Sequence, residues 1–288
     1  MSLKRTTAFI ALFLAFCPFP ASAQKHKFIH YGMENGMSSN TIFKILQDKD
    51  GLMWFGTNDG LTRFDGTTLK TWRNTPSDSR SLGNNSIYSL KEDRNGTLYI
   101  GTENGLYAFD KNEELFTEIL TTKSLPEAEM NSLSNILVRS LDLDKKNRLW
   151  IATLGQGLLR YDIETGRLVR FSKGKDNKYG IDSDYITSVL CDERGRTWCT
   201  NASQNIYLYD DDKNMFSRIH IYDERAKAEG NAAFSLCEDY QGNIWIGGWG
   251  NGLFRYDKTS GSFTNYRLTS DNGSKLYTGR IHTVTEVE

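Results

Sequence analysis

The stretch "GLMWFGTNDGLTRFDG", from Gly51 to Gly66, decides the fold, because nearly the same sequence occurs several times in the chain. It returns as "GTLYIGTENGLYAFDK" from Gly96 to Lys111 and as "GNIWIGGWGNGLFRYDK" from Gly242 to Lys258. Each copy holds an apolar segment, a short polar loop, a second apolar segment, and an aromatic residue followed by Asp. Gly, Asn and Asp accept the backbone angles of tight turns, so the phrase predicts a β-hairpin.

A repeat of fixed period runs along most of the chain. One turn residue recurs every 45 to 51 residues, with an Asp three residues before it and a Trp or Tyr three residues after it. The turn residues are Gly51, Gly96, Asn147, Gly195 and Gly242; the acids are Asp48, Asp93, Asp144, Asp192 and Asp239; the aromatics are Trp54, Tyr99, Trp150, Trp198 and Trp245. Five copies with this many aligned positions identify a repeat protein.

Each repeat predicts four short antiparallel strands, which in the second copy are residues 87–93, 98–102, 105–110 and 114–119. The apolar period is two, and glycine interrupts every unit, which argues against a helical solenoid. Four strands per 45 to 51 residues is the period of a β-propeller blade. We therefore expect an all-β chain: a β-propeller of four-stranded antiparallel blades, five of them complete.

The two ends predict an incomplete ring. The segment His26–Tyr31 matches a fourth strand with no strands before it, and Ile281–Glu288 matches only a first strand. We expect the first segment to close the ring and the last to begin a sixth blade. An open sheet edge would invite aggregation, so we expect the chain to be truncated at its C-terminal end and favour seven blades in the complete ring.

Residues 1–23 are predicted to be a signal peptide. Lys4 and Arg5 precede an apolar run, and Ala21-Ser22-Ala23 forms a small-residue cleavage site. Residues 24–288 are then a β-propeller domain, truncated at its C-terminal end, that works outside the cytoplasm. Three cysteines remain in this part, Cys191, Cys199 and Cys237, and a disulfide between the first two is permitted but not required.

The composition and the repeated acids argue against several functions. A net charge of -1 over 288 residues gives no basic surface for nucleic acid. The repeated Asp is expected to cap its turn, and the repeated Trp to pack between blades. The four histidines, His26, His30, His220 and His282, lack metal-ligand spacing. We therefore predict no catalytic residue, no metal and no cofactor.

The repeats resemble two-component regulator propeller repeats. The resemblance rests on "SSNTIFKILQDKDGLMWFGTNDGLTRFDG" (Ser38–Gly66) and "FSLCEDYQGNIWIGGWGNGLFRYD" (Phe234–Asp257), and the first, second and fifth repeats match closely. The third departs from the pattern at Asn147 and Ala152, and the fourth at Thr200 and Asn205, so the loop of the fourth is expected to be irregular.

The resemblance implies a periplasmic sensor region of a hybrid two-component histidine kinase of Bacteroidetes-type bacteria, anchored in the inner membrane. Such sensors detect oligosaccharides and regulate glycan-utilisation genes through kinase domains that would lie downstream in the same polypeptide. A homodimer of the full-length sensor is compatible with this interpretation. Two alternatives stay open: a scaffold for protein–protein contacts, and a propeller glycosidase or lyase.

Five residues are candidate ligand contacts on one face of the propeller. The loops between strands two and three, and the long loops between strand four and the next first strand, should emerge there, and long loops on a rigid scaffold often bind ligands. Trp249 lies in one of the former loops, off the packing register, where it either stacks on a sugar or packs under a neighbouring loop. Asn40, Asn85, Asp184 and Asn231 precede the innermost strands and either line the mouth of the channel or cap their strands.

Overall fold

The computed structural model describes residues 29–120, 136–174, 178–202, 205–220, 232–249, 252–266 and 281–285. The chain divides into two compact units, Met1–Tyr31 and Gly32–Glu288, and every helix and strand described lies in the second. The proposed signal peptide and most of the proposed closing strand His26–Tyr31 lie outside the described residues. Among the described residues, no helix has the length and apolarity that crossing a bilayer requires.

The second unit consists of five four-stranded antiparallel sheets, preceded by a short 3-10 helix, η1 (Met33–Asn35). In each sheet the strands pair in chain order. The strands are β1 (Ile42–Gln47), β2 (Met53–Thr57), β3 (Gly60–Phe64), β4 (Leu69–Trp72); β5 (Ile87–Glu92), β6 (Leu98–Thr102), β7 (Gly105–Asp110), β8 (Leu115–Glu118); β9 (Leu137–Leu143), β10 (Arg148–Leu154), β11 (Leu158–Asp162), β12 (Leu168–Phe171); β13 (Ile186–Cys191), β14 (Thr197–Asn201), β15 (Asn205–Asp210), β16 (Met215–His220); and β17 (Ala232–Glu238), β18 (Ile244–Trp249), β19 (Leu253–Tyr256), β20 (Phe263–Tyr266).

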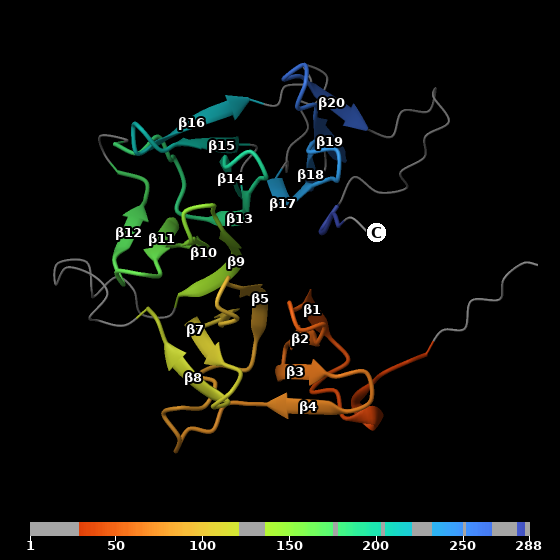
Figure 1. Cartoon of the computed structure of the whole chain (residues 1–288). Helices are drawn as coiled ribbons and strands as arrows, with labels where there is room; N and C mark the ends of the chain where they lie inside the picture. The colour runs from red at the N-terminus through yellow and green to blue at the C-terminus, as the bar shows by residue number, and fades with distance from the viewer. Residues whose placement is uncertain are drawn as a thin grey trace, which may run out of the picture. The chain divides into compact units, whose positions relative to one another are not determined.

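The first strands of the five sheets lie on the inside. Contacts join β1 to β5, β5 to β9, β9 to β13, and β13 to β17, while β4, β8, β12, β16 and β20 lie away from this centre (Figure 1). The predicted all-β fold of four-stranded antiparallel units is confirmed, and the strand bounds predicted for the second repeat agree with the structure to within one residue.

The repeated aspartate closes the turn between the first and second strands. Asp48 Oδ1 accepts the backbone N–H groups of Asp50 and Leu52, at 3.0 and 2.9 Å, and Asp48 Oδ2 accepts the indole Nε1–H of Trp54 at 2.8 Å. Equivalent indole bonds of 2.8 to 2.9 Å join Trp150 to Asp144, Trp198 to Asp192 and Trp245 to Asp239. The predicted turn cap is confirmed, and the indole bond also fixes the tryptophan.

The turn residue itself needs the left-handed backbone conformation. Gly51, Gly96, Gly195 and Gly242 have φ between 78° and 88°, and Asn147, the one substitution in the series, has φ of 57°. Glycine adopts this region without steric cost, and asparagine tolerates it better than most residues. The backbone geometry explains why glycine or asparagine recurs at this position of each repeat.

The tryptophans fill the space between neighbouring sheets. Trp54, Trp150 and Trp198 are fully buried. Each packs against an aromatic ring of the following sheet, namely Phe109, Tyr209 and Tyr256, with ring centroids 4.8 to 5.7 Å apart. Trp245, in the fifth sheet, stacks on Tyr266 of its own sheet and keeps part of its surface exposed. Full burial therefore depends on the sheet that follows.

A second repeated bond links the sheets at the opposite end of the strands. The N–H of Gly60, in the turn between β2 and β3, donates to the carbonyl of Asn85 just before β5, at 2.8 Å. Gly105 and Gly155 repeat this bond to Ile136 and Asp184, at 2.8 and 2.9 Å. The two kinds of loop thus emerge on one face, as predicted.

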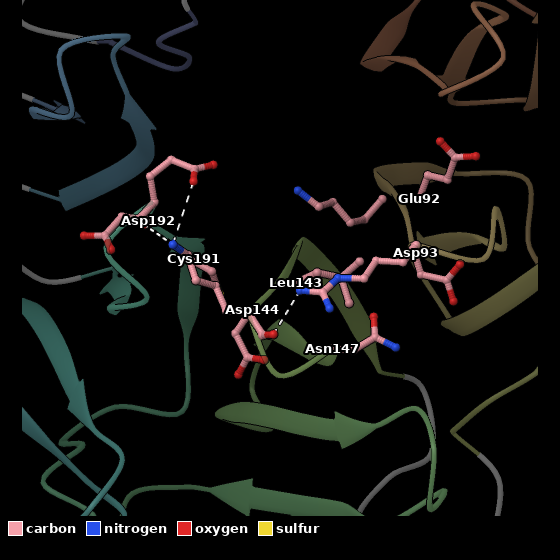
Figure 2. A pocket seen from close by; sticks show the side chains of 11 residues that line it. Glu92, Asp93, Leu143, Asp144, Asn147, Cys191 and Asp192 are labelled. Carbon is pink, nitrogen blue, oxygen red and sulfur yellow. Dashed lines mark hydrogen bonds and ion pairs between the residues drawn. The ribbon is translucent and has the colours of Figure 1, made fainter.

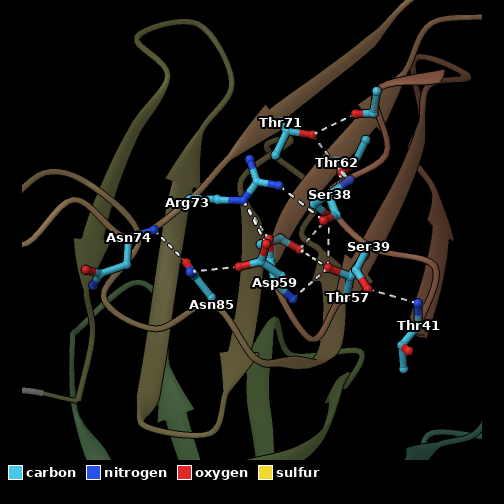
Figure 3. Close-up of polar contacts among 12 residues, drawn as sticks. Ser38, Ser39, Thr41, Thr57, Asp59, Thr62, Thr71, Arg73, Asn74 and Asn85 are labelled. Carbon is cyan, nitrogen blue, oxygen red and sulfur yellow. Dashed lines mark hydrogen bonds and ion pairs between the residues drawn. The ribbon is translucent and has the colours of Figure 1, made fainter. Parts of the chain in front are cut away.

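The lead-in before β1 is held on the first sheet by buried hydroxyl groups (Figure 3). Ser38 Oγ lies 2.8 Å from Thr57 Oγ1 and accepts the hydroxyl of Thr62 at 2.9 Å. Thr62 Oγ1 in turn lies 2.9 Å from Thr71 Oγ1, and Arg73 Nη2 donates to the Ser38 carbonyl at 3.1 Å. Every hydroxyl of this group has a partner, so the network serves the fold.

The three cysteines among the described residues, Cys191, Cys199 and Cys237, are free thiols. Across the hairpin, Cys191 stands opposite Thr197, and Cys199 stands opposite Val189. The register therefore separates the two side chains that a disulfide would have to join. Burial raises the pKa of the Cys199 thiol, which keeps this group protonated and unreactive.

Replacing Trp150 with alanine should lower the free energy of unfolding by about 3–5 kcal/mol, because it leaves a cavity between two sheets. Asp144 Oδ2 also loses the indole N–H and keeps Arg148 Nε as its donor. Trp245→Ala should cost less, about 1–3 kcal/mol, since part of that ring is exposed. Urea unfolding followed by circular dichroism measures both values. Equal losses in the two variants would show that packing against the next sheet adds no stability.

Candidate ligand-binding site at the centre of the sheets

Every first strand contains a β-bulge that leaves one residue out of its ladder. The pairing with the second strand shifts register around Phe43, Tyr88, Arg139, Thr187 and Phe234. A bulge twists the strand and re-aims a side chain, which is why bulges are frequent beside binding sites. The five bulged residues occupy the same position in five repeats and all reach one pocket.

This pocket, the axial pocket, has a volume of about 340 Å³ and is lined by β1, β5, β9, β13, β17 and residues 282–284. A volume of this size accommodates a small ligand or one to two sugar rings. The bulged residues give it aromatic, hydroxyl and cationic groups, and charged side chains from the same strands complete its lining. These are the groups that a site for a polar, ring-shaped ligand requires.

The aromatic part of the axial pocket lies between β1 and β5. The rings of Phe43 and Tyr88 stack with centroids 4.9 Å apart and an interplanar angle of 20°. The guanidinium carbon of Arg139 lies 5.6 Å from the centroid of the Tyr88 ring, within the range of a cation–π contact. Phe43 is exposed in spite of its apolar ring. A planar aromatic surface and a cation are therefore available side by side.

The polar part of the pocket is an ion pair. Lys91 Nζ lies 2.5 Å from Asp142 Oδ1, and Asp142 Oδ2 accepts the backbone N–H of Cys191 at 2.6 Å. Burial alone would lower the pKa of Lys91, but the charge of Asp142 outweighs it and raises that pKa above its ordinary value. The pair joins β5, β9 and β13 and fixes both side chains.

A larger pocket, of about 640 Å³, lies at the turns between the first and second strands (Figure 2). Its lining includes Asp93, Asp144 and Asp192, which cap three successive turns. The Oδ1 atoms of all three accept backbone N–H groups, and Oδ2 of the latter two accepts indole N–H groups. These carboxylates are committed to the fold, so this pocket is the weaker candidate.

One group of acids has the arrangement of a metal site. A single oxygen from each of Asp48, Asp50 and Glu92 comes within 4.8 Å of the others. The Nζ of Lys111 bonds to all three carboxylates, at 2.9, 3.0 and 2.7 Å. The ammonium group supplies the positive charge that a cation would bring, and the cluster is best described as an ion-pair network.

This network shifts the pKa values of its members in opposite directions. Burial would raise the pKa of Asp48, but hydrogen bonds from Trp54 and Lys111 outweigh it and hold that pKa below its ordinary value. Burial would lower the pKa of Lys111, but its bonds to Glu92, Asp48 and Asp50 raise it well above the usual range. Lys111, from the second sheet, thereby stabilises the turn of the first.

The predicted contacts at the loop face are engaged with backbone groups. Asn40 Oδ1 accepts the N–H of Met33 at 3.0 Å. Asn85 Oδ1 accepts the N–H of Asn74 at 2.6 Å, and Asp184 Oδ1 accepts that of Lys173 at 2.8 Å. Asn85 also donates to Asp59 Oδ1 at 3.2 Å, as Figure 3 shows. These three residues close loops, and none of them lines the axial pocket.

Of the other two predicted contacts, Trp249 ends β18, where its backbone pairs with Ala232, and its side chain lies outside the description. Asn231 lies outside the described residues. The sequence interpretation did not single out the bulged residues. A signal was present: aromatic residues and an arginine occupy the second or third position of the innermost strands, where a core would need a small or aliphatic residue.

A family model described as two-component regulator propeller matches residues 36–59, 81–104 and 229–250. The chain carries two-component regulator propeller repeats. The three matched segments belong to the first, second and fifth repeats, the ones that the sequence pattern marked as close matches. Histidine kinase P4 of Formosa agariphila is 35% identical over 82 residues, which are 28% of this chain and 6% of that protein.

Solved structures share the propeller fold. The extracellular domains of the hybrid two-component systems BT3049 and BT4673 of B. thetaiotaomicron superpose with TM-scores of 0.55 and 0.60, at 19% and 20% identity, covering 88% and 87% of this chain. The chain spans little more than a third of those domains, 38% and 36%. A virginiamycin B lyase of Staphylococcus aureus superposes with a TM-score of 0.63 at 15% identity, covering 86% of this chain and 76% of the enzyme.

Lys111→Ala should lower the free energy of unfolding at pH 7 by about 3–5 kcal/mol, because it leaves buried carboxylates without their cation. Since the pKa of Asp48 is lowered in the folded protein, its contribution to stability is present above about pH 4 and is lost as the pH falls further. The difference between the variant and the parent should therefore shrink below that pH.

Urea unfolding of both proteins from about pH 3 to about pH 8, a range that includes the ordinary pKa values of carboxylates, measures this dependence. Lys111→Arg, which keeps the charge, is the control and should retain most of the stability. A difference that stays constant with pH would contradict the proposed role of the ion pairs.

Proposed function

We propose that this chain is the extracytoplasmic ligand-binding propeller of a two-component signalling protein and that it recognises an oligosaccharide. The observation that carries the proposal is the axial pocket, where the bulges of five inner strands present Phe43, Tyr88, Arg139, Thr187 and Phe234 to one cavity. The regulator propeller repeats support the signalling role.

The chemistry of the pocket suits a sugar. Aromatic rings offer flat apolar surfaces to the C–H faces of a pyranose, while arginine and hydroxyl groups bond its hydroxyls. The Phe43–Tyr88 pair supplies such a surface, and Arg139 supplies a polar group from a neighbouring strand. The hydroxyl of Thr187 donates to the Ala233 carbonyl and contributes to the pocket wall. Trp249, at the end of β18, is proposed as a further stacking residue at the loop face.

The signalling context comes from the relatives. The curated match is a histidine kinase, and the two Bacteroides structures are extracellular domains of hybrid two-component systems. We propose the same arrangement for this protein: a signal peptide at residues 1–23, a periplasmic propeller, anchoring in the inner membrane, and downstream kinase domains in the same polypeptide. Ligand binding would then regulate genes for glycan use.

A propeller lyase is the second candidate, because a virginiamycin B lyase shares the fold. An enzyme of this kind needs a base or acid held near the substrate. Among the described residues that line the axial pocket, the candidates for an acid or base are Asp142 and His282. Asp142 is engaged by Lys91 and the Cys191 N–H, so His282 is the residue that an enzymatic role would have to use.

The expected result for Tyr88→Ala is an affinity for the cognate oligosaccharide that falls by about tenfold or more, because Tyr88 packs against both the Phe43 ring and the Arg139 guanidinium and holds them in the pocket. Tyr240, an aromatic residue that is 84% exposed and lies outside the axial pocket, provides the control variant Tyr240→Ala. Calorimetry of the purified protein against a panel of glycan fragments measures both, with Trp249→Ala alongside.

The two tyrosine variants separate the outcomes. Equal affinities for Tyr88→Ala and Tyr240→Ala would place the ligand elsewhere and overturn the axial site. Turnover of a bound glycan, detected by chromatography after incubation, would replace the sensor with an enzyme.

A further inference from the structure

The charges of the axial pocket are unbalanced. Its described lining contains the cations Lys44, Lys91 and Arg139 and one carboxylate, Asp142. The single carboxylate is already bonded to Lys91 Nζ at 2.5 Å and to the Cys191 N–H at 2.6 Å. One ion pair therefore forms, and two cationic side chains are left facing the cavity.

Neither of these two cations is neutralised by the described residues. Arg139 contacts the face of the Tyr88 ring, and no carboxylate of the described residues makes an ion pair with it or with Lys44. A guanidinium or ammonium group beside low-dielectric walls attracts an anion more strongly than the same group in bulk water. The cavity is thus an anion site in its electrostatics.

Lys44 carries a charge that the folded protein does not favour. The walls of the pocket desolvate the ammonium group although it still reaches solvent, and this lowers the pKa of Lys44. The nearby charge of Lys91 adds to the effect, and the charge of Asp142 opposes it. A bound anion would remove the repulsion.

The cations and the aromatic rings are adjacent in the chain. Lys44 follows Phe43 on β1, and Arg139 lies over Tyr88 on the neighbouring strand. Both cations line the same cavity as the exposed Phe43 ring, so a sugar at that ring could present a charged substituent to them. The guanidinium fork matches the paired oxygens of a carboxylate or a sulfate ester, and the ammonium adds a point charge.

We infer that the axial pocket selects an anionic saccharide, one that bears a carboxylate or sulfate group on a sugar ring. This inference rests on the proposed function, because it names the ligand class of the same site. The aromatic pair would hold the sugar ring, and Lys44 and Arg139 would bind the charged substituent.

The test uses matched pairs of ligands and the purified protein. Uronic acid oligosaccharides are compared with neutral oligosaccharides of the same linkage, and sulfated oligosaccharides with their desulfated forms. Calorimetry at about 20 mM and about 300 mM NaCl measures each affinity, since screening weakens a charge contact at the higher salt. The acidic member of a pair should bind about tenfold or more tightly at low salt, and the preference should shrink at high salt.

The variants locate the effect. Lys44→Gln and Arg139→Gln should each remove about tenfold or more of the affinity for the acidic ligand and leave the neutral one nearly unchanged. Lys49→Gln removes the same charge from an exposed residue that does not line the pocket, and should have no effect. Thermal unfolding checks folding, and Lys44→Gln should be as stable as the parent or more stable.

Each outcome decides a separate point. Equal or tighter binding of the neutral member overturns the charge selectivity and leaves the sensor proposal standing. Binding of neither member of any pair overturns the proposed function together with this inference. An acidic preference that Lys44→Gln and Arg139→Gln leave intact, as Lys49→Gln does, places the anion outside the axial pocket.

Discussion

A hydrogen bond from a tryptophan Nε1 to the Oδ2 of an aspartate six residues earlier links the turn, the second strand and the packing between sheets. The same carboxylate accepts two backbone N–H groups with its other oxygen, so it shapes the turn that starts the second strand. Because the indole is anchored, its ring is held where the next sheet packs against it. A buried carboxylate with all its partners is stabilising, whereas one that lost them would be costly. In the first, third and fourth repeats, turn, strand and sheet packing therefore depend on one side-chain pair.

The sequence could predict the fold because these requirements are local. A left-handed turn residue, an acid before it and an aromatic after it stand at fixed spacings, and each position has a single physical explanation. Tyr99 shows how far the pattern tolerates change: it lacks an indole N–H and is still buried in the second sheet. The partial exposure of Trp245 could not be predicted, since burial depends on what a neighbouring sheet covers, and no local pattern reports this.

The axial pocket could not be predicted from the sequence, for a different reason. A bulge shifts one side chain out of the alternation of a strand, and the shift depends on hydrogen bonds to the partner strand. Phe43 and Tyr88 therefore looked like ordinary strand residues. Asn85 and Asp184 had two interpretations from the sequence, ligand contacts at the loop face or caps of their strands. Their oxygens bond to backbone N–H groups, and the geometry of the loop decides this.

Asn85 also gives the scaffold a mechanical property. Its amide holds the loop that precedes β5, its side chain reaches Asp59 of the previous sheet, and its carbonyl accepts the N–H of Gly60. Tyr88 follows only three residues later on the strand that lines the axial pocket. A displacement of the inner end of β5 must therefore pull on the neighbouring sheet as well as on its own loop. One residue therefore couples the start of β5 to the neighbouring sheet and to the loop at Asn74.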